Sequence, residues 1–401
     1  MTGKERILDA LSGGKPAVSP VAIDYMLLYL AERIERAYVA AYRPRLERDG
    51  RVRPDPDEDV EIRAQALLQA HGCFQEQDDW FQVSGIPIPE VLARRELVLE
   101  GNQVFEVNHA AGTRRELLLD GEEAKTEEMR QRFQRTSQLG LDKAGLLQEL
   151  AQHRESSRMA RGNLRLVEIL SGKMGDTRFL YTGESAPFWL LYDLLGFEGT
   201  MTALLDAPKL VFEIMEVALE ATLEYAQAFK DAGGHGIRVE ECLVSADMIS
   251  PRMYERFVLP YEERLFEQLR RMGLKSILYF CGDVMPRLPA LCQLPIDALM
   301  VEESKKNFVI DIGEVRDTVG PDLCLLGNVD AYGILEKAAR AELAAEVKRQ
   351  VRVAGRDGAF IVGLGSPVTL PTPPERVDLL IRAARDALSH AAAEDASRGD
   401  A

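Results

Sequence analysis

The stretch Arg178-Phe-Leu-Tyr-Thr182 is the first of six short, mostly apolar segments that decide the fold of this chain. The others are Gly236-Ile-Arg-Val-Glu240, Ser276-Ile-Leu-Tyr-Phe280, Ala298-Leu-Met-Val-Glu302, Leu323-Cys-Leu-Leu-Gly327 and Ala359-Phe-Ile-Val-Gly363. Such runs are typical of parallel strands that are buried on both faces. Amphipathic stretches such as Pro208–Ala232 and Pro251–Met272 separate them and predict helices.

Two earlier runs, Val18–Asp24 and Trp80–Val83, extend this pattern to eight strands that alternate with helices. Eight such units predict an α/β fold, a (β/α)8 TIM barrel. A doubly wound open sheet is the alternative, but no Gly-x-Gly-x-x-Gly turn follows the first strand.

The chain has 401 residues, whereas a bare barrel needs about 250. Residues 95–107 alternate in polarity and turn at Gly101-Asn102, and Thr113–Leu119 continues the pattern. We therefore expect a β-hairpin or meander inserted after the second strand, followed by surface helices in Asp120–Gly162. The insertion would span about residues 86–162 of one barrel domain, residues 1–390, with residues 391–401 as a flexible tail.

Composition limits the location and the partners of the chain. Its 49 Lys and Arg against 65 Asp and Glu give a formal net charge of −16, which argues against nucleic acid or an anionic membrane as the main partner. No apolar run is long enough to span a membrane, and the N-terminus lacks the pattern of a secretory signal. The five cysteines are scattered and odd in number, which indicates free thiols in a reducing compartment. We therefore expect a cytoplasmic protein.

Residues at the carboxyl ends of barrel strands face the active site. In this chain those positions are rich in carboxylates, hold two thiols and lack a cluster of arginines. They are Asp24, Tyr25, Ser84, Glu184, Ser185, Glu240, Glu241, Cys242, Tyr279, Cys281, Glu302, Glu303, Asn328, Asp330, Gly365 and Ser366.

An acidic ring of this kind has several interpretations. The carboxylates could cap the helices that follow the strands, or form a metal site, a pocket for a cation, or an acid/base set. All five histidines fall away from the strand ends. A metal would therefore need carboxylate and thiolate ligands, such as Glu240 or Glu241 with Cys281, and Cys242 if its side chain turns inward. Alternatively, Cys242 and Cys281 are small residues that only fill space beside the barrel.

Several motifs resemble the uroporphyrinogen decarboxylase superfamily, over most of residues 1–390 and most densely over 178–385. They are Lys4–Pro16, Gly183-Glu-Ser-Ala-Pro-Phe188, Ile249–Tyr261, Tyr279-Phe-Cys-Gly-Asp283, Leu326-Gly-Asn-Val-Asp330 and Gly365–Pro374. The resemblance implies a (β/α)8 barrel, in agreement with the strand count.

The resemblance also separates two branches of chemistry. True decarboxylases carry an arginine-rich motif after the first strand, whereas Ala22–Tyr29 holds no arginine. A polycarboxylate porphyrinogen would lack its clamp here. The meander at 95–119 resembles one in the corrinoid-dependent methyltransferases, and it favours that branch.

Members of the coenzyme M type bind zinc through His-x-Cys after strand five and a cysteine after strand eight, and zinc there activates a thiol. This chain has Tyr279-Phe280-Cys281 and Ser366 at those places, so two of the three ligands are replaced. A methyltransferase that demethylates an oxygen or nitrogen donor needs only to polarise the leaving atom. Glu240, Glu241, the Tyr279 hydroxyl or a carboxylate-held metal would do this.

We therefore expect a methyltransferase that transfers a methyl group from a small methoxylated or methylated donor to the corrinoid (cobalamin) of a partner protein. Glu240, Glu241 and Tyr279 are the expected catalytic residues, and Cys281 with Glu240 the expected ligands of a metal such as zinc. The expected substrate-binding residues are Asp24, Tyr25, Glu184, Glu302, Asn328, Asp330 and Ser366. The resemblance also suggests a homodimer.

Two alternatives remain open. One is a decarboxylase of a small acid or a porphyrinogen on the same barrel, with Asp24 or Tyr279 as proton donor. The other is a non-catalytic barrel that binds a ligand or a corrinoid.

Overall fold

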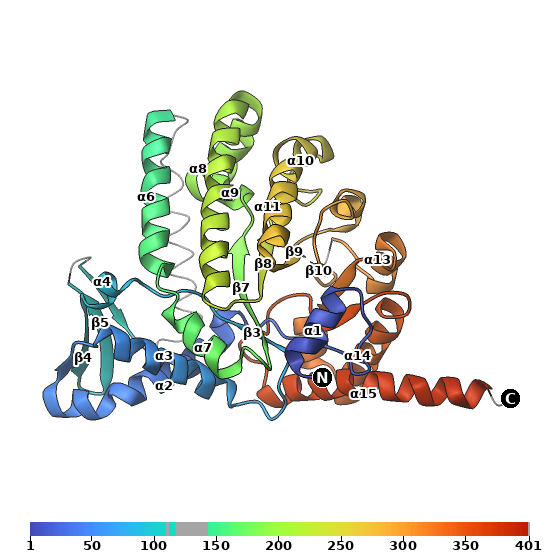
Figure 1. Ribbon diagram of the computed structural model, residues 1–401, viewed down its shortest axis with the longest axis horizontal. Helices are drawn as coiled ribbons and strands as arrows, with labels where there is room; N and C mark the ends of the chain where they lie inside the picture. Colours follow the sequence, from blue (N-terminus) through green and yellow to red (C-terminus); the bar gives the residue numbers. More distant parts are fainter. Residues whose placement is uncertain (110–111, 118–142, 306, 400–401) are drawn as a thin grey trace.

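The computed structural model describes residues 1–109, 112–117, 143–305 and 307–399. Eight parallel strands form one sheet, in the order β1-β12-β11-β10-β9-β8-β7-β3 (Figure 1). Their bounds are β1 (Val21–Ala22), β3 (Trp80–Gln82), β7 (Phe179–Ser185), β8 (Gly236–Glu241), β9 (Lys275–Phe280), β10 (Ala298–Val301), β11 (Cys324–Val329) and β12 (Phe360–Leu364). Each predicted strand is present. Neighbours in space follow the chain order, which confirms the barrel over the doubly wound sheet.

The barrel closes between its two shortest strands, β1 and β3, through a few hydrogen bonds. The backbone N–H of Asp79 donates to the Val21 carbonyl at 2.7 Å, and the Asp79 carboxylate accepts from the Val21 N–H at 2.8 Å. The Trp80 indole donates to the Ile23 carbonyl at 2.9 Å. These bonds join the two edges where a regular strand ladder is absent from the described pairs.

Helices surround the barrel. They are α1 (Gly3–Leu11), α2 (Met26–Asp49), α3 (Pro56–His71), α4 (Pro89–Leu92), α6 (Lys143–Arg161), α7 (Arg165–Met174), α8 (Phe188–Asp206), α9 (Pro208–Asp231), α10 (Pro251–Phe257), α11 (Leu259–Met272), α12 (Leu288–Leu291), α13 (Ile312–Val319), α14 (Arg340–Ala354) and α15 (Pro374–Gly399), with short turns η1 (Met285–Arg287) and η2 (Ala331–Lys337). The helix predicted over 251–272 is interrupted at Val258. It begins with Ser250 as N-cap and Pro251 in its first turn, as such residues favour.

Side chains of the barrel strands alternate between the interior and the helix layer, because successive residues of a strand point to opposite faces. On β7, Phe179 and Tyr181 belong to the interior cluster, whereas Leu180 belongs to the helix-facing core. The helix α1 covers the amino-terminal end of the barrel, where Ile7, Ala10 and Leu11 pack into the interior cluster. The opposite, carboxyl-terminal end is therefore the end left for a site.

The insertion contributes β4, β5 and β6 to a second, antiparallel sheet in the order β2-β4-β5-β6, whose edge strand β2 comes from the connection between β1 and β3. The strands β4 and β5 are labelled in Figure 1. The strands of this sheet are β2 (Arg51–Val52), β4 (Arg95–Glu100), β5 (Gln103–Asn108) and β6 (Thr113–Glu116). The predicted turn at Gly101 is present, with φ of 60°, whereas β2 is a strand that the sequence did not predict. Tyr38 and Tyr42 of α2 pack with Leu97 and Val104 of this sheet.

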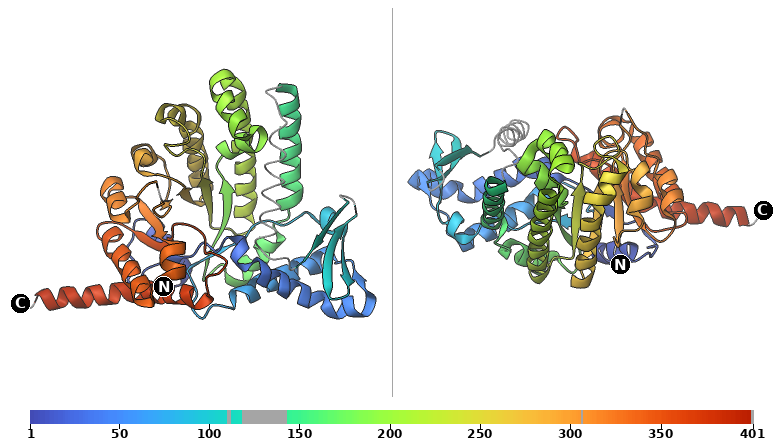
Figure 2. Two further views of the ribbon diagram at one scale, coloured as in Figure 1. Left: turned by 180° about the vertical axis from the view of Figure 1, so that it is seen from behind. Right: turned by 90° about the horizontal axis from the view of Figure 1, so that it is seen from above.

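The predicted boundaries of the insertion and of the tail stay predictions. The helix α6 lies in the stretch predicted to be helical, and residues 118–142 lie outside the described part. The helix α15 continues through the predicted boundary at residue 390 to Gly399, at the end of the molecule opposite the second sheet (Figure 2). Among the described residues, no helix is long and apolar enough to cross a membrane.

Candidate active site

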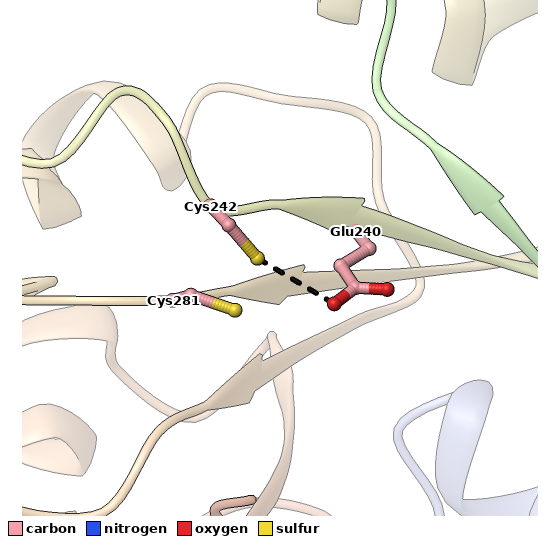
Figure 3. Close-up of side chains that lie close together, drawn as sticks. All are labelled: Glu240, Cys242 and Cys281. Atoms are coloured by element: carbon pink, nitrogen blue, oxygen red, sulfur yellow. Dashed lines mark hydrogen bonds between the residues drawn. The ribbon is translucent and has the colours of Figure 1, made fainter. Parts of the chain in front are cut away.

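Three side chains at the carboxyl ends of β8 and β9 point toward one another: Glu240, Cys242 and Cys281 (Figure 3). The strand register explains the meeting, because Glu240 pairs with Tyr279 and Glu241 with Phe280, so that Cys242 and Cys281 follow side by side. The Cys281 N–H donates to the Glu241 carbonyl at 2.9 Å, which continues the ladder by one step. One ligand atom from each side chain lies within 4.8 Å of the other two.

One distance in the Glu240–Cys242–Cys281 cluster, from the Cys242 sulfur to Glu240 Oε1, matches that between two ligands of a tetrahedral metal such as zinc. The Cys242 thiol donates to Glu240 Oε1 at 3.5 Å. A tetrahedral zinc would hold a thiolate sulfur and a carboxylate oxygen about 3.5 Å apart, given bonds of about 2.3 and 2.0 Å. All three side chains are half-buried. The predicted pair of Cys281 and Glu240 is thus brought together, and Cys242 does turn inward.

A proton must leave this cluster before a metal can bind. A hydrogen bond with Cys281 and then burial raise the pKa of the Cys242 thiol well above its ordinary value. Thiolates are the metal-binding form of cysteine. Metal binding at Cys242 would therefore release a proton to solvent.

An arginine that the strand-end pattern does not include lies below this cluster. Arg238 points into the barrel from β8, and its Nη1 donates to the fully buried carboxylate of Asp24. Its Nη2 lies 3.8 Å from Glu240 Oε2, and its guanidinium lies 5.3 Å from the centre of the Tyr279 ring. The mouth therefore contains a buried cation beside its carboxylates. The sequence signal for this buried cation is an arginine that alternates with Ile237 and Val239 along the strand.

Tyr279 forms one wall of the interior beside Arg238. Its hydroxyl donates to the Gly365 carbonyl at 2.7 Å, and burial raises the pKa of this hydroxyl well above its ordinary value. The hydroxyl therefore keeps its proton and bonds to the backbone. The catalytic role predicted for Tyr279 stays a prediction.

Lys305 neutralises the carboxylates at the end of the neighbouring strand β10. Its Nζ lies 3.1 Å from Glu302 Oε1 and 2.5 Å from Glu303 Oε1. The Ser366 hydroxyl donates to Glu303 Oε1 at 2.7 Å, and the Gly282 N–H donates to Glu302 Oε2 at 2.7 Å. Ser366 and Glu302 thus lie in one polar network, which reaches the backbone of the residue after Cys281.

Glu241 does not face the mouth, contrary to the prediction. It follows Ile237 and Val239 on the helix-facing side of β8 and is fully buried there. The Leu243 N–H donates to its Oε1 at 3.2 Å. Burial, followed by repulsion from Glu262 of α11, raises the pKa of the Glu241 carboxyl well above its ordinary value. Two adjacent strand residues cannot both point inward, so the acid at the mouth is Glu240.

Glu184 is displaced from the mouth by the same alternation. It lies on the helix-facing side of β7, where Arg161 of α6 donates to its Oε2 at 3.0 Å. The Arg161 guanidinium also lies 4.0 Å from the centre of the Tyr225 ring. Burial raises the pKa of the Glu184 carboxyl, and Arg161 opposes this shift. Glu184 therefore anchors α6 to the barrel.

The three remaining predicted residues serve the surrounding structure. Asp330 caps η2, where it accepts from the Tyr332 and Gly333 N–H groups at 2.9 and 2.8 Å. The Asn328 amide donates to the Glu302 and Ile310 carbonyls at 3.1 and 3.2 Å. The Tyr25 ring packs against Phe74, 4.9 Å between centres, in the helix-facing core. The capping interpretation thus applies to Asp330.

Comparisons with known proteins agree with this barrel. The uroporphyrinogen decarboxylase (URO-D) family model matches residues 144–387. A methyltransferase structure from Methanosarcina mazei superposes with a TM-score of 0.61 at 18% identity, over 96% of this chain and 98% of that one.

Curated relatives carry both chemistries of the family. A methylcobamide:CoM methyltransferase of Methanosarcina barkeri is 26% identical over 223 residues, which is 56% of this chain and 62% of the relative. A uroporphyrinogen decarboxylase of Trichlorobacter lovleyi is 28% identical over 225 residues, 54% of this chain and 63% of the relative. The chain thus spans about three fifths of the length of these relatives.

Proposed function

The chain belongs to the uroporphyrinogen decarboxylase family, and we propose that it is a corrinoid-dependent methyltransferase that demethylates a small methoxylated or methylated donor. The observation that carries this proposal is the Glu240–Cys242–Cys281 cluster at the mouth. Relatives at this level of similarity include a methylcobamide:CoM methyltransferase and a methylated-thiol–coenzyme M methyltransferase. Two thiols and a carboxylate suit methyl-group chemistry better than porphyrinogen decarboxylation, for which the arginine clamp is missing.

The residues of the chain have separate tasks in this proposal. Glu240, Cys242 and Cys281 would hold a zinc ion, which when bound acts as a Lewis acid on the oxygen, nitrogen or sulfur that carries the methyl group. Asp24 fixes the Arg238 guanidinium, and Arg238 in turn lies against Glu240. The Tyr279 ring supports Arg238 from the neighbouring strand. The corrinoid of a separate protein would supply the methyl acceptor at the open end of the barrel.

A second candidate is transfer in the opposite direction, from a methylated corrinoid to a small thiol. The pair of cysteines favours it, since zinc held by thiolates lowers the pKa of a thiol bound at its open position. Both directions use the same cluster and the same partner. They differ in the small molecule that enters the mouth.

The test is methyl transfer by the purified chain with free cob(I)alamin and a panel of methoxylated, N-methylated and S-methylated donors. We expect methylcobalamin in the visible spectrum and a demethylated product by mass spectrometry, both lost in Cys281→Ser and Glu240→Gln. Formation of a methylated thiol from methylcobalamin would favour the second candidate. Carbon dioxide release from a carboxylated substrate without any corrinoid would contradict both and favour a decarboxylase.

A further inference from the structure

We propose that the methyl donor carries a carboxylate, which docks on the Nε–Nη2 edge of Arg238 beside Gln82. This inference rests on the proposed function, because it names a class of donor for the same mouth. It goes against the acidic character that the strand ends suggest, and it comes from Arg238 Nε, a buried donor without a hydrogen-bond partner among the described residues, and from the donors beside it.

The bonding of Arg238 is incomplete. Its side chain is 3% exposed, and among the described residues only its Nη1 makes a hydrogen bond, to Asp24. Its Nε is buried without a hydrogen-bond partner among the described residues. Its Nη2 lies 3.8 Å from Glu240 Oε2, which is beyond hydrogen-bond distance. A guanidinium binds carboxylates through two parallel N–H groups, and the Nε–Nη2 edge is the one that Asp24 leaves free.

A second donor faces the same place. Gly183 pairs with Arg238 across β7 and β8. A Cβ atom at Gly183 would lie 3.4 Å from Arg238 Nη2, 3.9 Å from Arg238 Nε and 3.5 Å from Gln82 Nε2. The free edge of Arg238 and the Gln82 amide thus converge beside a glycine, which adds no side chain there. Gln82 and Gly183 are partly exposed.

The chemistry of these donors selects a carboxylate. Three N–H donors in one place need an acceptor with at least two oxygens, and an ether or amine supplies too few. A monoanion suits the site better than a phosphate dianion, because Glu240 lies close to the same guanidinium. The Tyr181 hydroxyl, also inside the barrel, is a further buried donor without a partner in the described part of the chain.

The strand fixes the spacing within such a donor. Arg238 and Glu240 both point inward from β8 and are two residues apart, a separation of about 7 Å along a strand. A donor whose carboxylate binds Arg238 would therefore direct its methylated atom toward the Glu240–Cys242–Cys281 cluster. A rigid spacer such as an aromatic ring is of suitable length.

Direct binding of two probe pairs, by calorimetry at millimolar concentration, tests the proposal without any corrinoid. The pairs are 4-methoxybenzoate with 4-methoxybenzamide, and methoxyacetate with methoxyacetamide. We expect at least one carboxylate to bind about tenfold to a hundredfold more tightly than its amide, as charge-assisted bidentate bonds provide. Equal binding within both pairs, or no binding by any probe, would overturn the proposal.

Variants identify the residues. Gln82→Leu leaves the Asp24–Arg238 pair intact and should weaken the carboxylate but not the amide. Asp24→Asn with Arg238→Gln removes both buried charges together and should abolish the preference. Arg264→Gln is the matched control, because Arg264 forms an exposed ion pair with Glu216. This variant should keep the preference for the carboxylate over the amide. A preference that survives the double variant would contradict the role of Arg238. Methyl transfer from donors without a carboxylate would refute this inference and leave the proposed function standing.

Discussion

Glu240 and Glu241 are adjacent glutamates, and their roles differ because their side chains point to opposite faces of the strand β8. Glu240 points into the mouth, with its carboxylate 3.5 Å from the Cys242 sulfur. Glu241 points to the helices and is buried beside Glu262. The sequence alone could have predicted that Glu240, and not Glu241, faces the mouth, because strand alternation places Arg238 and Glu240 on one face. The sequence alone could not have predicted the partner of Arg238, since Asp24 is far away in the chain.

The Asp24–Arg238 pair makes a prediction at this scale. Arg238→Gln leaves the Asp24 carboxylate buried without its cation, which costs about 3–5 kcal/mol in similar cases. Asp24→Asn combined with Arg238→Gln should cost clearly less than Arg238→Gln alone, because no charge is left unpaired. Urea unfolding of the four proteins in the cycle measures both values. A single variant as stable as the parent would show that the pair is not desolvated.

Between elements, β8 packs on α10 and α11 through buried acids. Tyr254 of α10 donates to Glu262 of α11, and Glu241 of β8 faces Glu262. Burial raises the pKa of Glu262 from its ordinary value to about 7, although Tyr254 and Arg287 lower it. Glu241 Oε2 and Glu262 Oε1 are both buried without partners among the described residues. This contact therefore favours protonated acids.

The raised pKa values predict how stability depends on pH. Between about pH 4.5 and pH 7 the folded protein keeps a proton on Glu262 that the unfolded chain has released. The stabilisation is therefore complete below about pH 4.5 and is lost as the pH rises toward 7. Glu262→Gln, which does not titrate, should gain stability relative to the parent over this range, by up to about 1.4 kcal/mol per pH unit. A stability difference that stays constant with pH would contradict the shift.

At the scale of the whole molecule, the barrel could be predicted because each strand is an apolar run and the strands alternate with helices. The insertion was visible through its turn at Gly101 and its alternating strands. The edge strand β2 was not, since two residues, Arg51 and Val52, are too short for a periodic signal. The mouth was predicted as a ring of acids, but its charge also depends on Arg238, whose partner Asp24 is remote in the chain, and on Lys305, which lies beyond the strand ends. A net charge of −16 therefore says little about this one site.

The Glu240–Cys242–Cys281 cluster is the central claim, and the metal content of the purified chain tests it most directly. After incubation with zinc and removal of the excess, elemental analysis should give one zinc per chain. Glu240→Gln, Cys242→Ser and Cys281→Ser should each lose it. Glu241→Gln, which faces the helices, and Cys292→Ser, at an exposed thiol, should retain it. A parent protein that binds no zinc, or cysteine variants at the cluster that still hold one zinc per chain, would contradict the account.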